Sequence, residues 1–94
     1  MTYKETLLKA EEQGISVIGL MVAHEFNCQI ECEDIALSPD AFESACYLIE
    51  RAYLNTCENS IDNITRALIN MWVNENQSLK EIDVWDLLQR ASYY

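Results

Sequence analysis

The chain has 94 residues, half of them hydrophobic, and a formal net charge of −10. This length fits one domain, expected over residues 1–94, and the apolar fraction argues against intrinsic disorder. The negative balance disfavours direct binding to nucleic acid or to an anionic membrane, because both carry negative charge. The longest mainly apolar run, residues 15–23, is too short to cross a bilayer, which needs about 20 residues.

A first helix is expected over about residues 3–13. Thr2-Tyr-Lys-Glu5 matches a capping box, in which the Thr hydroxyl and the Glu carboxylate each satisfy a free backbone amide. Apolar residues follow at helical spacing, and Gly14 suits the position just after the last turn.

Residues 15–33 carry two conflicting patterns. The spacing of Ile15, Ile18, Val22 and Phe26 predicts a helix over residues 15–27, with little support for a helix that continues through Asn27. The run is also rich in β-branched residues, and residues 28–33 alternate between apolar and polar. The alternative is therefore a short β-hairpin at about residues 15–33 packed on helices, although no Asn-Gly or Asp-Gly turn joins its two halves.

Three further helices are expected towards the C-terminus. Ser38-Pro39-Asp40 is a strong helix start, because Ser caps, Pro fits the first turn and Asp complements the helix dipole. A fresh cap is expected near Ser60, and Ser78 and Asp83 are rival caps for the last helix. Each predicted helix has apolar residues on one face: Phe42, Ala45, Cys46, Ile49, Ala52 and Tyr53; Ile61, Ile64, Leu68, Met71 and Trp72; Val84, Leu87, Leu88 and Ala91. The predicted fold is mainly α, a small bundle of four to five short helices.

The acidic residues are distributed very unevenly. No Lys or Arg occurs between Lys9 and Arg51, whereas nine acidic residues do: Glu11, Glu12, Glu25, Glu31, Glu33, Asp34, Asp40, Glu43 and Glu50. The remainder of the chain has seven acidic residues against six basic ones. We call residues 10–50 the acidic segment. Its charge predicts attraction to a basic protein surface, and we expect its carboxylates to gather on one side of the fold.

The sequence therefore predicts a non-enzymatic protein that inhibits a nucleic-acid-binding or otherwise basic-grooved partner. Carboxylates would supply the attraction, and apolar groups nearby would supply contacts that exclude water, because charge tunes association rate more than affinity. The predicted partner-binding residues are Glu25, Glu31, Glu33, Asp34, Asp40 and Glu43, with Phe26 and Tyr47 as apolar contacts.

Catalytic and metal-binding patterns are weak. Gly14 and Gly19 stand alone, so the sequence contains no Gly-rich phosphate loop, and His24-Glu25 lacks the second histidine of a zinc protease motif. His24, Cys28 and Cys32 would share a helix face, with Cys46 as a fourth ligand, but this spacing matches no known zinc motif. We expect reduced cysteines packed in the core and predict no metal, no cofactor and no enzymatic activity. Trp72 and Trp85 are expected in the core, and Tyr93 and Tyr94 at the surface.

In size and charge the chain resembles the small acidic proteins by which phages and mobile elements disarm host defences, including anti-CRISPR proteins and anti-restriction DNA mimics. The polar N-terminus Met-Thr-Tyr-Lys-Glu does not match a signal peptide, so we expect a cytoplasmic protein, in the host cytoplasm if phage-encoded. A toxin-neutralising immunity protein or antitoxin is the main alternative, with its acidic face over a basic nuclease site. A third hypothesis is a structural adaptor or homodimer that uses surplus apolar surface.

Overall fold

The structure, a computed structural model, describes residues 5, 8–9, 12, 17–56 and 59–94. These residues form helices and contain no strand, which confirms the mainly α prediction and shows that the hairpin alternative was wrong. Glu5, Leu8, Lys9 and Glu12 are helical, whereas the cap predicted at Thr2 lies outside the described residues. The elements are α2 (Val17–Cys32), α3 (Pro39–Leu54), α4 (Ile61–Ile69), the π-helical turn η1 (Asn70–Asn74) and α5 (Val84–Ala91).

Helix α2 continues through Asn27 to Cys32, five residues beyond the predicted end at residue 27. Its buried face consists of Val22, Phe26 and Ile30, which recur every four residues. Packing of this face against both α3 and α4 outweighs the strand preference of the β-branched residues.

The end of α2 turns the chain sharply and is stabilised by its own backbone. The amide of Ile35 donates to the carbonyl of Ile30 at 2.9 Å, and the amide of Asp34 donates to Glu31 at 3.2 Å. Asp34 has a positive φ of 56°, the left-handed conformation that this Schellman-type ending requires. Ile35 packs against the core. The turn therefore fixes Glu33 and Asp34 at the corner between α2 and α3.

Helices α3 and α4 begin where the caps predict. The hydroxyl of Ser38 accepts a hydrogen bond from the amide of Ala41 at 3.2 Å, and Ser60 accepts from Asn63 at 3.1 Å. The predicted apolar faces point inward in both helices. In η1 the amide of Glu75 donates to the carbonyl of Asn70, five residues earlier, so the final turn of this helix is wider than an α-helical turn.

Helix α5 starts after Asp83 rather than after Ser78. The carbonyl and hydroxyl of Ser78 instead accept from the amides of Glu81 and Lys80, which makes a turn before the helix. The predicted stripe in α5 is buried, but Trp85 is 67 % exposed, so the expectation that Trp85 lies in the core was wrong. Trp72 packs at the edge of the core, and Tyr93 and Tyr94 are exposed as predicted.

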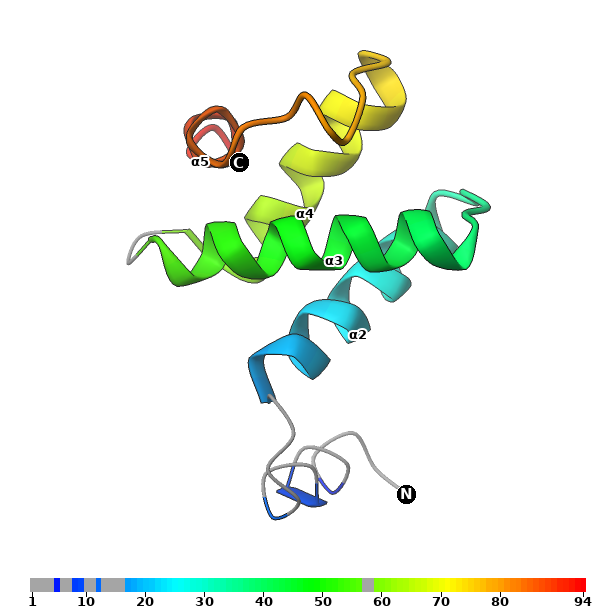
Figure 1. Ribbon diagram of the computed structural model, residues 1–94, viewed down its shortest axis with the longest axis vertical. Coiled ribbons are helices and arrows are strands. Elements are labelled where there is room, and N and C mark those ends of the chain that lie inside the picture. The colour runs from blue at the N-terminus through cyan, green and yellow to red at the C-terminus, as the bar shows by residue number, and fades with distance from the viewer. Residues whose placement is uncertain (1–4, 6–7, 10–11, 13–16, 57–58) are drawn as a thin grey trace.

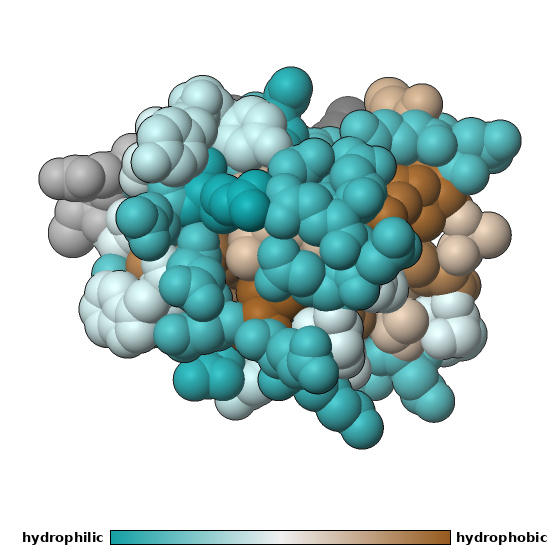
Figure 2. Space-filling view, turned by 90° about the horizontal axis from the view of Figure 1, so that it is seen from above, coloured by the Kyte–Doolittle hydropathy of each residue, from teal (hydrophilic) through white to brown (hydrophobic). Residues whose placement is uncertain are grey.

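Helices α2, α3, α4 and α5 enclose one apolar core. Helix α3 runs across the middle of the molecule in Figure 1, with α2 mostly below it and α4 and α5 above it. Helix α4 packs on α2, α3 and α5. The largest completely buried apolar side chains come from all four helices: Val22, Phe26, Ile49, Ile64, Leu68 and Leu87. Figure 2, which looks onto the side of α5, shows a mostly hydrophilic surface with hydrophobic residues visible between the polar ones.

Thr65 is the buried polar residue of this core. Its side chain is completely buried, and its hydroxyl has no hydrogen-bond partner among the described residues. Because an unsatisfied buried hydroxyl costs about 1–3 kcal/mol, we expect Thr65→Val to raise the free energy of unfolding by about 1 kcal/mol. Thr56→Val is the control, since the Thr56 hydroxyl accepts from the amide of Asn59 and its loss is expected to destabilise. Urea unfolding of both variants measures this, and equal destabilisation would contradict the prediction.

Candidate partner-binding surface

Most carboxylates of the acidic segment lie in residues 17–50, and none of these forms an ion pair within the part of the chain that the structure describes. Residues 17–50 of that part contain seven acidic side chains and no Lys or Arg: Glu25, Glu31, Glu33, Asp34, Asp40, Glu43 and Glu50. The ion pairs Arg66–Asp62 and Arg90–Glu75 use none of these seven. Five of the seven are exposed, and Glu25 and Glu50 are half-buried.

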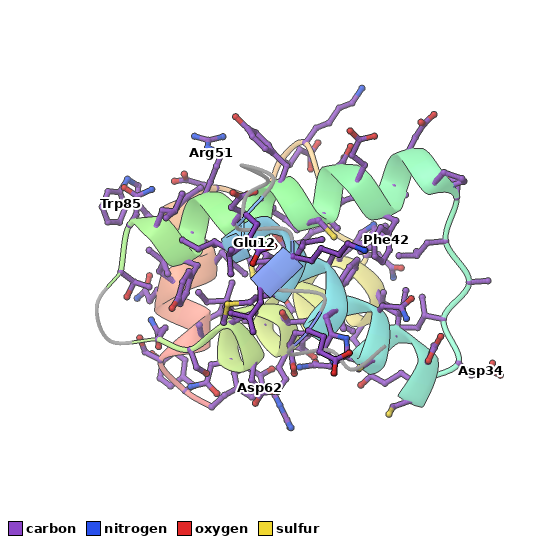
Figure 3. The ribbon with its side chains drawn as sticks, turned by 90° about the horizontal axis from the view of Figure 1, so that it is seen from below. Glu12, Asp34, Phe42, Arg51, Asp62 and Trp85 are labelled. Atoms are coloured by element: carbon purple, nitrogen blue, oxygen red, sulfur yellow. The ribbon has the colours of Figure 1, made fainter. Side chains whose placement is uncertain are left out.

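The corner between α2 and α3 concentrates part of this charge. Glu31 lies in the last turn of α2, Glu33 and Asp34 form the turn, and Asp40 stands in the first turn of α3. All four side chains are exposed. We call them the corner carboxylates. Figure 3 shows Asp34 at one extremity of the molecule, far from Trp85 at the other.

The predicted carboxylates do not line one common cavity. Glu25 and Glu33 border a groove of about 340 Å³ between α2 and α4. Glu43 borders a different hollow on α3, of about 430 Å³, together with Tyr47 and Glu50. Asp40 borders a third hollow, of about 380 Å³, which also contains Lys80. The acidic residues thus border several separate hollows on α2 and α3 instead of forming a single flat face.

Gln29 organises the groove between α2 and α4. Its side-chain nitrogen donates to Asp62 Oδ1 at 2.8 Å and to Glu25 Oε1 at 3.0 Å, and it lies 3.3 Å from the carbonyl oxygen of Asp62. Arg66 pairs with Asp62 at 3.0 Å one helical turn later. The groove therefore has three carboxylates (Glu25, Glu33 and Asp62) against one guanidinium, an arrangement that favours a cationic side chain of a partner.

Sequence reasoning missed Gln29, Asp62 and Arg66 as parts of this groove. The spacing of Asp62 and Arg66 by four residues is a readable signal for an ion pair on a helix. Gln29 carries no such signal, because its partner Asp62 is 33 residues away along the chain.

Of the two apolar residues predicted to contact a partner, one is buried and the other is exposed. Phe26 is completely buried, with its ring centroid 5.2 Å from that of Phe42, so the prediction that Phe26 contacts a partner was wrong. Phe26 belongs to the buried face of α2, together with Val22 and Ile30, whereas the acidic residues of α2 lie on other faces of the helix. Tyr47 is 62 % exposed, and the Arg51 guanidinium lies 5.6 Å from its ring centroid. Tyr47 is thus available to a partner.

The expectation that the cysteines pack in the core was wrong for Cys28 and Cys32, which are exposed on α2. Cys28 Sγ lies 3.8 Å from Nε2 of His24, which is also exposed. The described residues contain no group of three or more His, Cys, Asp or Glu side chains placed to hold a metal ion. Cys46 is half-buried, and burial, assisted by the charge of Glu50, raises the pKa of its thiol to about 11. At neutral pH this thiol is protonated and a poor nucleophile.

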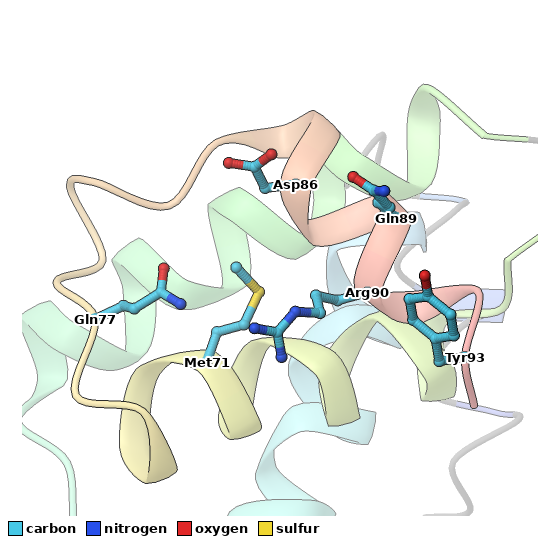
Figure 4. A pocket seen from close by; sticks show the side chains of 6 residues that line it. All are labelled: Met71, Gln77, Asp86, Gln89, Arg90 and Tyr93. Atoms are coloured by element: carbon cyan, nitrogen blue, oxygen red, sulfur yellow. The ribbon is translucent and has the colours of Figure 1, made fainter.

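A further polar cavity lies between η1, the following connection and α5. It has a volume of about 310 Å³ and is lined by Met71, Gln77, Asp86, Gln89, Arg90 and Tyr93, as Figure 4 shows. The guanidinium of Arg90 donates to both carboxylate oxygens of Glu75, at 2.7 Å to Oε1. These hydrogen bonds tie the connection after η1 to α5 and lower the pKa of Glu75.

The Glu75–Arg90 pair predicts a specific pH dependence. Because the folded pKa of Glu75 is lower than its ordinary value of 4.5, its contribution to stability is present above pH 4.5 and is lost as the pH falls through the folded pKa. We expect the melting temperature of Glu75→Gln to fall less than that of the parent protein below pH 4.5. Glu81→Gln, which makes the same change of charge, is the control. An equal pH slope in the parent and Glu75→Gln would contradict the prediction.

Within the described part of the chain, no helix is long and apolar enough to span a membrane. Comparison of the sequence with protein-family models and with curated proteins, and of the structure with solved structures, finds no significant match.

Proposed function

We propose that this protein is a non-enzymatic inhibitor that binds a nucleic-acid-binding or otherwise basic-grooved protein, of the kind that phages and mobile elements use against host defences. The observation that carries the proposal is the set of seven acidic side chains in residues 17–50 of the described chain, none of which is held in an ion pair. Carboxylates that form no ion pair attract a basic partner at long range. No ion pair within the protein has to be broken before they bind the partner's cationic side chains.

The distribution of these carboxylates favours a concave partner. The corner carboxylates stand at the α2–α3 end of the bundle, while Glu25 and Glu43 border separate hollows on its sides. If the α2–α3 end entered a basic groove, the corner carboxylates would face the bottom of the groove, and Glu25 and Glu43 would face its sides. The site that the protein occupies would be one built for nucleic acid, whose duplex form carries one charge per about 1.7 Å of axis. The proposal places the protein in the cytoplasm, where such partners act.

Affinity capture at low ionic strength tests the proposal. The bait is the full chain, and the matched bait carries Glu31→Gln, Glu33→Gln and Asp34→Asn, which remove three charges with little change in shape. Proteins retained by the parent bait, reduced on the matched bait and released by about 0.5 M salt are identified by mass spectrometry. A nucleic-acid-binding defence protein would support the proposal. A secreted nuclease or a paired toxin would instead identify an immunity protein or antitoxin.

Two results would contradict the proposal as a whole. One is a captured partner whose affinity is unchanged in about 0.5 M salt, because an electrostatic interface between exposed charges weakens with screening. The other is equal capture by the parent and matched baits.

A further inference from the structure

Three large apolar side chains are exposed on α3 and at the start of α5. Tyr47 is 62 %, Leu54 is 61 % and Trp85 is 67 % exposed. Single exposed apolar residues are common on protein surfaces, but Trp and Tyr are the residues that most often carry binding energy at interfaces. Trp85 is also the less buried of the two tryptophans, although every apolar residue of the predicted α5 stripe is buried.

These residues lie on α3 and on the helix that packs against it. Tyr47, Arg51 and Leu54 follow each other at spacings of four and three residues, so they share the outer face of α3. Helix α5 packs on α3. Figure 3 shows Arg51 and Trp85 projecting near the same end of α3, away from Asp34. We call Tyr47, Arg51, Leu54 and Trp85 the α3 strip.

Acidic residues border the α3 strip. Glu43 and Glu50 line the hollow of about 430 Å³ in which Tyr47 lies, and Asp86 follows Trp85 in the first turn of α5. Arg51 is the one cation of the strip, and its guanidinium lies over the Tyr47 ring. Two carboxylates thus lie near Tyr47, and a third, Asp86, is adjacent to Trp85 in the sequence.

We propose that the α3 strip is a docking surface for a basic amphipathic segment of a partner protein. Cationic side chains of that segment would face Glu43 and Glu50, and its apolar side chains would cover Tyr47, Leu54 and Trp85. This inference rests on the proposed function and adds to it a second contact surface, because Trp85 lies far from the corner carboxylate Asp34. Charge complementarity selects this occupant over a second copy of the chain, because two copies would each bring a net charge of −10.

A defined peptide tests the inference on the full chain. The probe is a synthetic amphipathic helix of lysine and leucine, and its control has the same lysines with serine in place of leucine. Trp72→Phe, checked for folding by circular dichroism, leaves Trp85 as the single tryptophan reporter. We expect the probe to shift Trp85 emission to shorter wavelength and to bind about tenfold more tightly than the serine control.

Variants locate the contact. Tyr47→Ala and Leu54→Ala are each expected to weaken binding of the probe about tenfold, whereas Tyr93→Ala, at a side chain 79 % exposed elsewhere, is expected to leave it unchanged. Equal affinity of the two peptides, or equal losses in Tyr47→Ala and Tyr93→Ala, would overturn the inference. The inference can fail while the proposed function stands. That would be the result if the peptide test failed but Glu31→Gln, Glu33→Gln and Asp34→Asn together still reduced capture of the partner.

The oligomeric state tests the competing occupant. We expect light scattering to give the mass of one chain for the parent protein and for Trp85→Ala. A doubled mass in the parent that Trp85→Ala reduces to one chain would assign the α3 strip to a second copy and overturn the inference.

Discussion

Replacing Phe26 with alanine is expected to lower the free energy of unfolding by about 3–5 kcal/mol, the range for truncating a buried aromatic side chain. Phe26 is completely buried in α2, and its ring packs against Phe42. The helix faces α3 and α4 through the stripe of Val22, Phe26 and Ile30, so the cavity would open at the junction of three helices. Urea unfolding followed by circular dichroism measures the loss.

Tyr47→Ala is the matched control for Phe26→Ala. Both changes truncate an aromatic residue that the sequence suggested as a contact with a partner, but Tyr47 is exposed, and its loss is expected to change stability by no more than about 0.5 kcal/mol. Small domains are stable by only about 5–15 kcal/mol, so Phe26→Ala would remove a large part of the stability, and any loss of binding would follow from the weakened fold. A Phe26→Ala variant that kept its stability and lost only partner binding would show that Phe26 contacts the partner directly.

The starts of the later helices could be predicted because their signals are local. Ser38 and Ser60 each accept a hydrogen bond from an amide three residues later, and Pro39 cannot continue a preceding helix but fits a first turn. Their apolar stripes have a clear helical period. The local sequence could not decide whether α5 begins after Ser78 or after Asp83, since each is a good cap. Packing of Val84 and Leu87 sets the start of α5 after Asp83.

Helix α2 was harder to predict because its sequence shows both the helical spacing of apolar residues and the alternation that is typical of a strand. The alternation over residues 28–33 is compatible with a strand, yet only Ile30 of that run is buried, and it continues the stripe of Val22 and Phe26. Extending that stripe by four residues would have predicted both the later helix end and the burial of Phe26. The ending itself carries no glycine, and Asp34 adopts the left-handed conformation instead.

The charge of the candidate surface could be predicted, but its shape could not. An absence of Lys and Arg over residues 10–50 is visible in composition alone. The grouping of Glu25 with Asp62, by contrast, depends on how α2 crosses α4, and the exposure of Trp85 depends on where α5 meets α3. Both are products of helix packing, which the sequence of a single helix does not specify.

Neutralising Glu31, Glu33 and Asp34 together is expected to weaken binding and to strengthen the fold. Removing three exposed charges reduces the field that speeds encounter, so association with the captured partner at low salt should slow by about tenfold or more. The same change relieves repulsion among carboxylates that form no ion pair, so the free energy of unfolding should rise by about 0.5 kcal/mol. Stopped-flow association and urea unfolding measure the two effects.

The substitutions are chosen to preserve local structure. Asp34 has a φ of 56°, which asparagine also tolerates, and a glutamine at position 31 keeps the oxygen that accepts from Asn27 at 3.2 Å. Glu5→Gln, Glu81→Gln and Asp83→Asn together remove the same charge outside the acidic segment and should slow association less. If the variant without the charges of Glu31, Glu33 and Asp34 unfolded faster and associated at an unchanged rate, these three carboxylates would support the fold instead of attracting the partner. Equal slowing in both triple variants would mean that net charge, rather than the α2–α3 corner, attracts the partner.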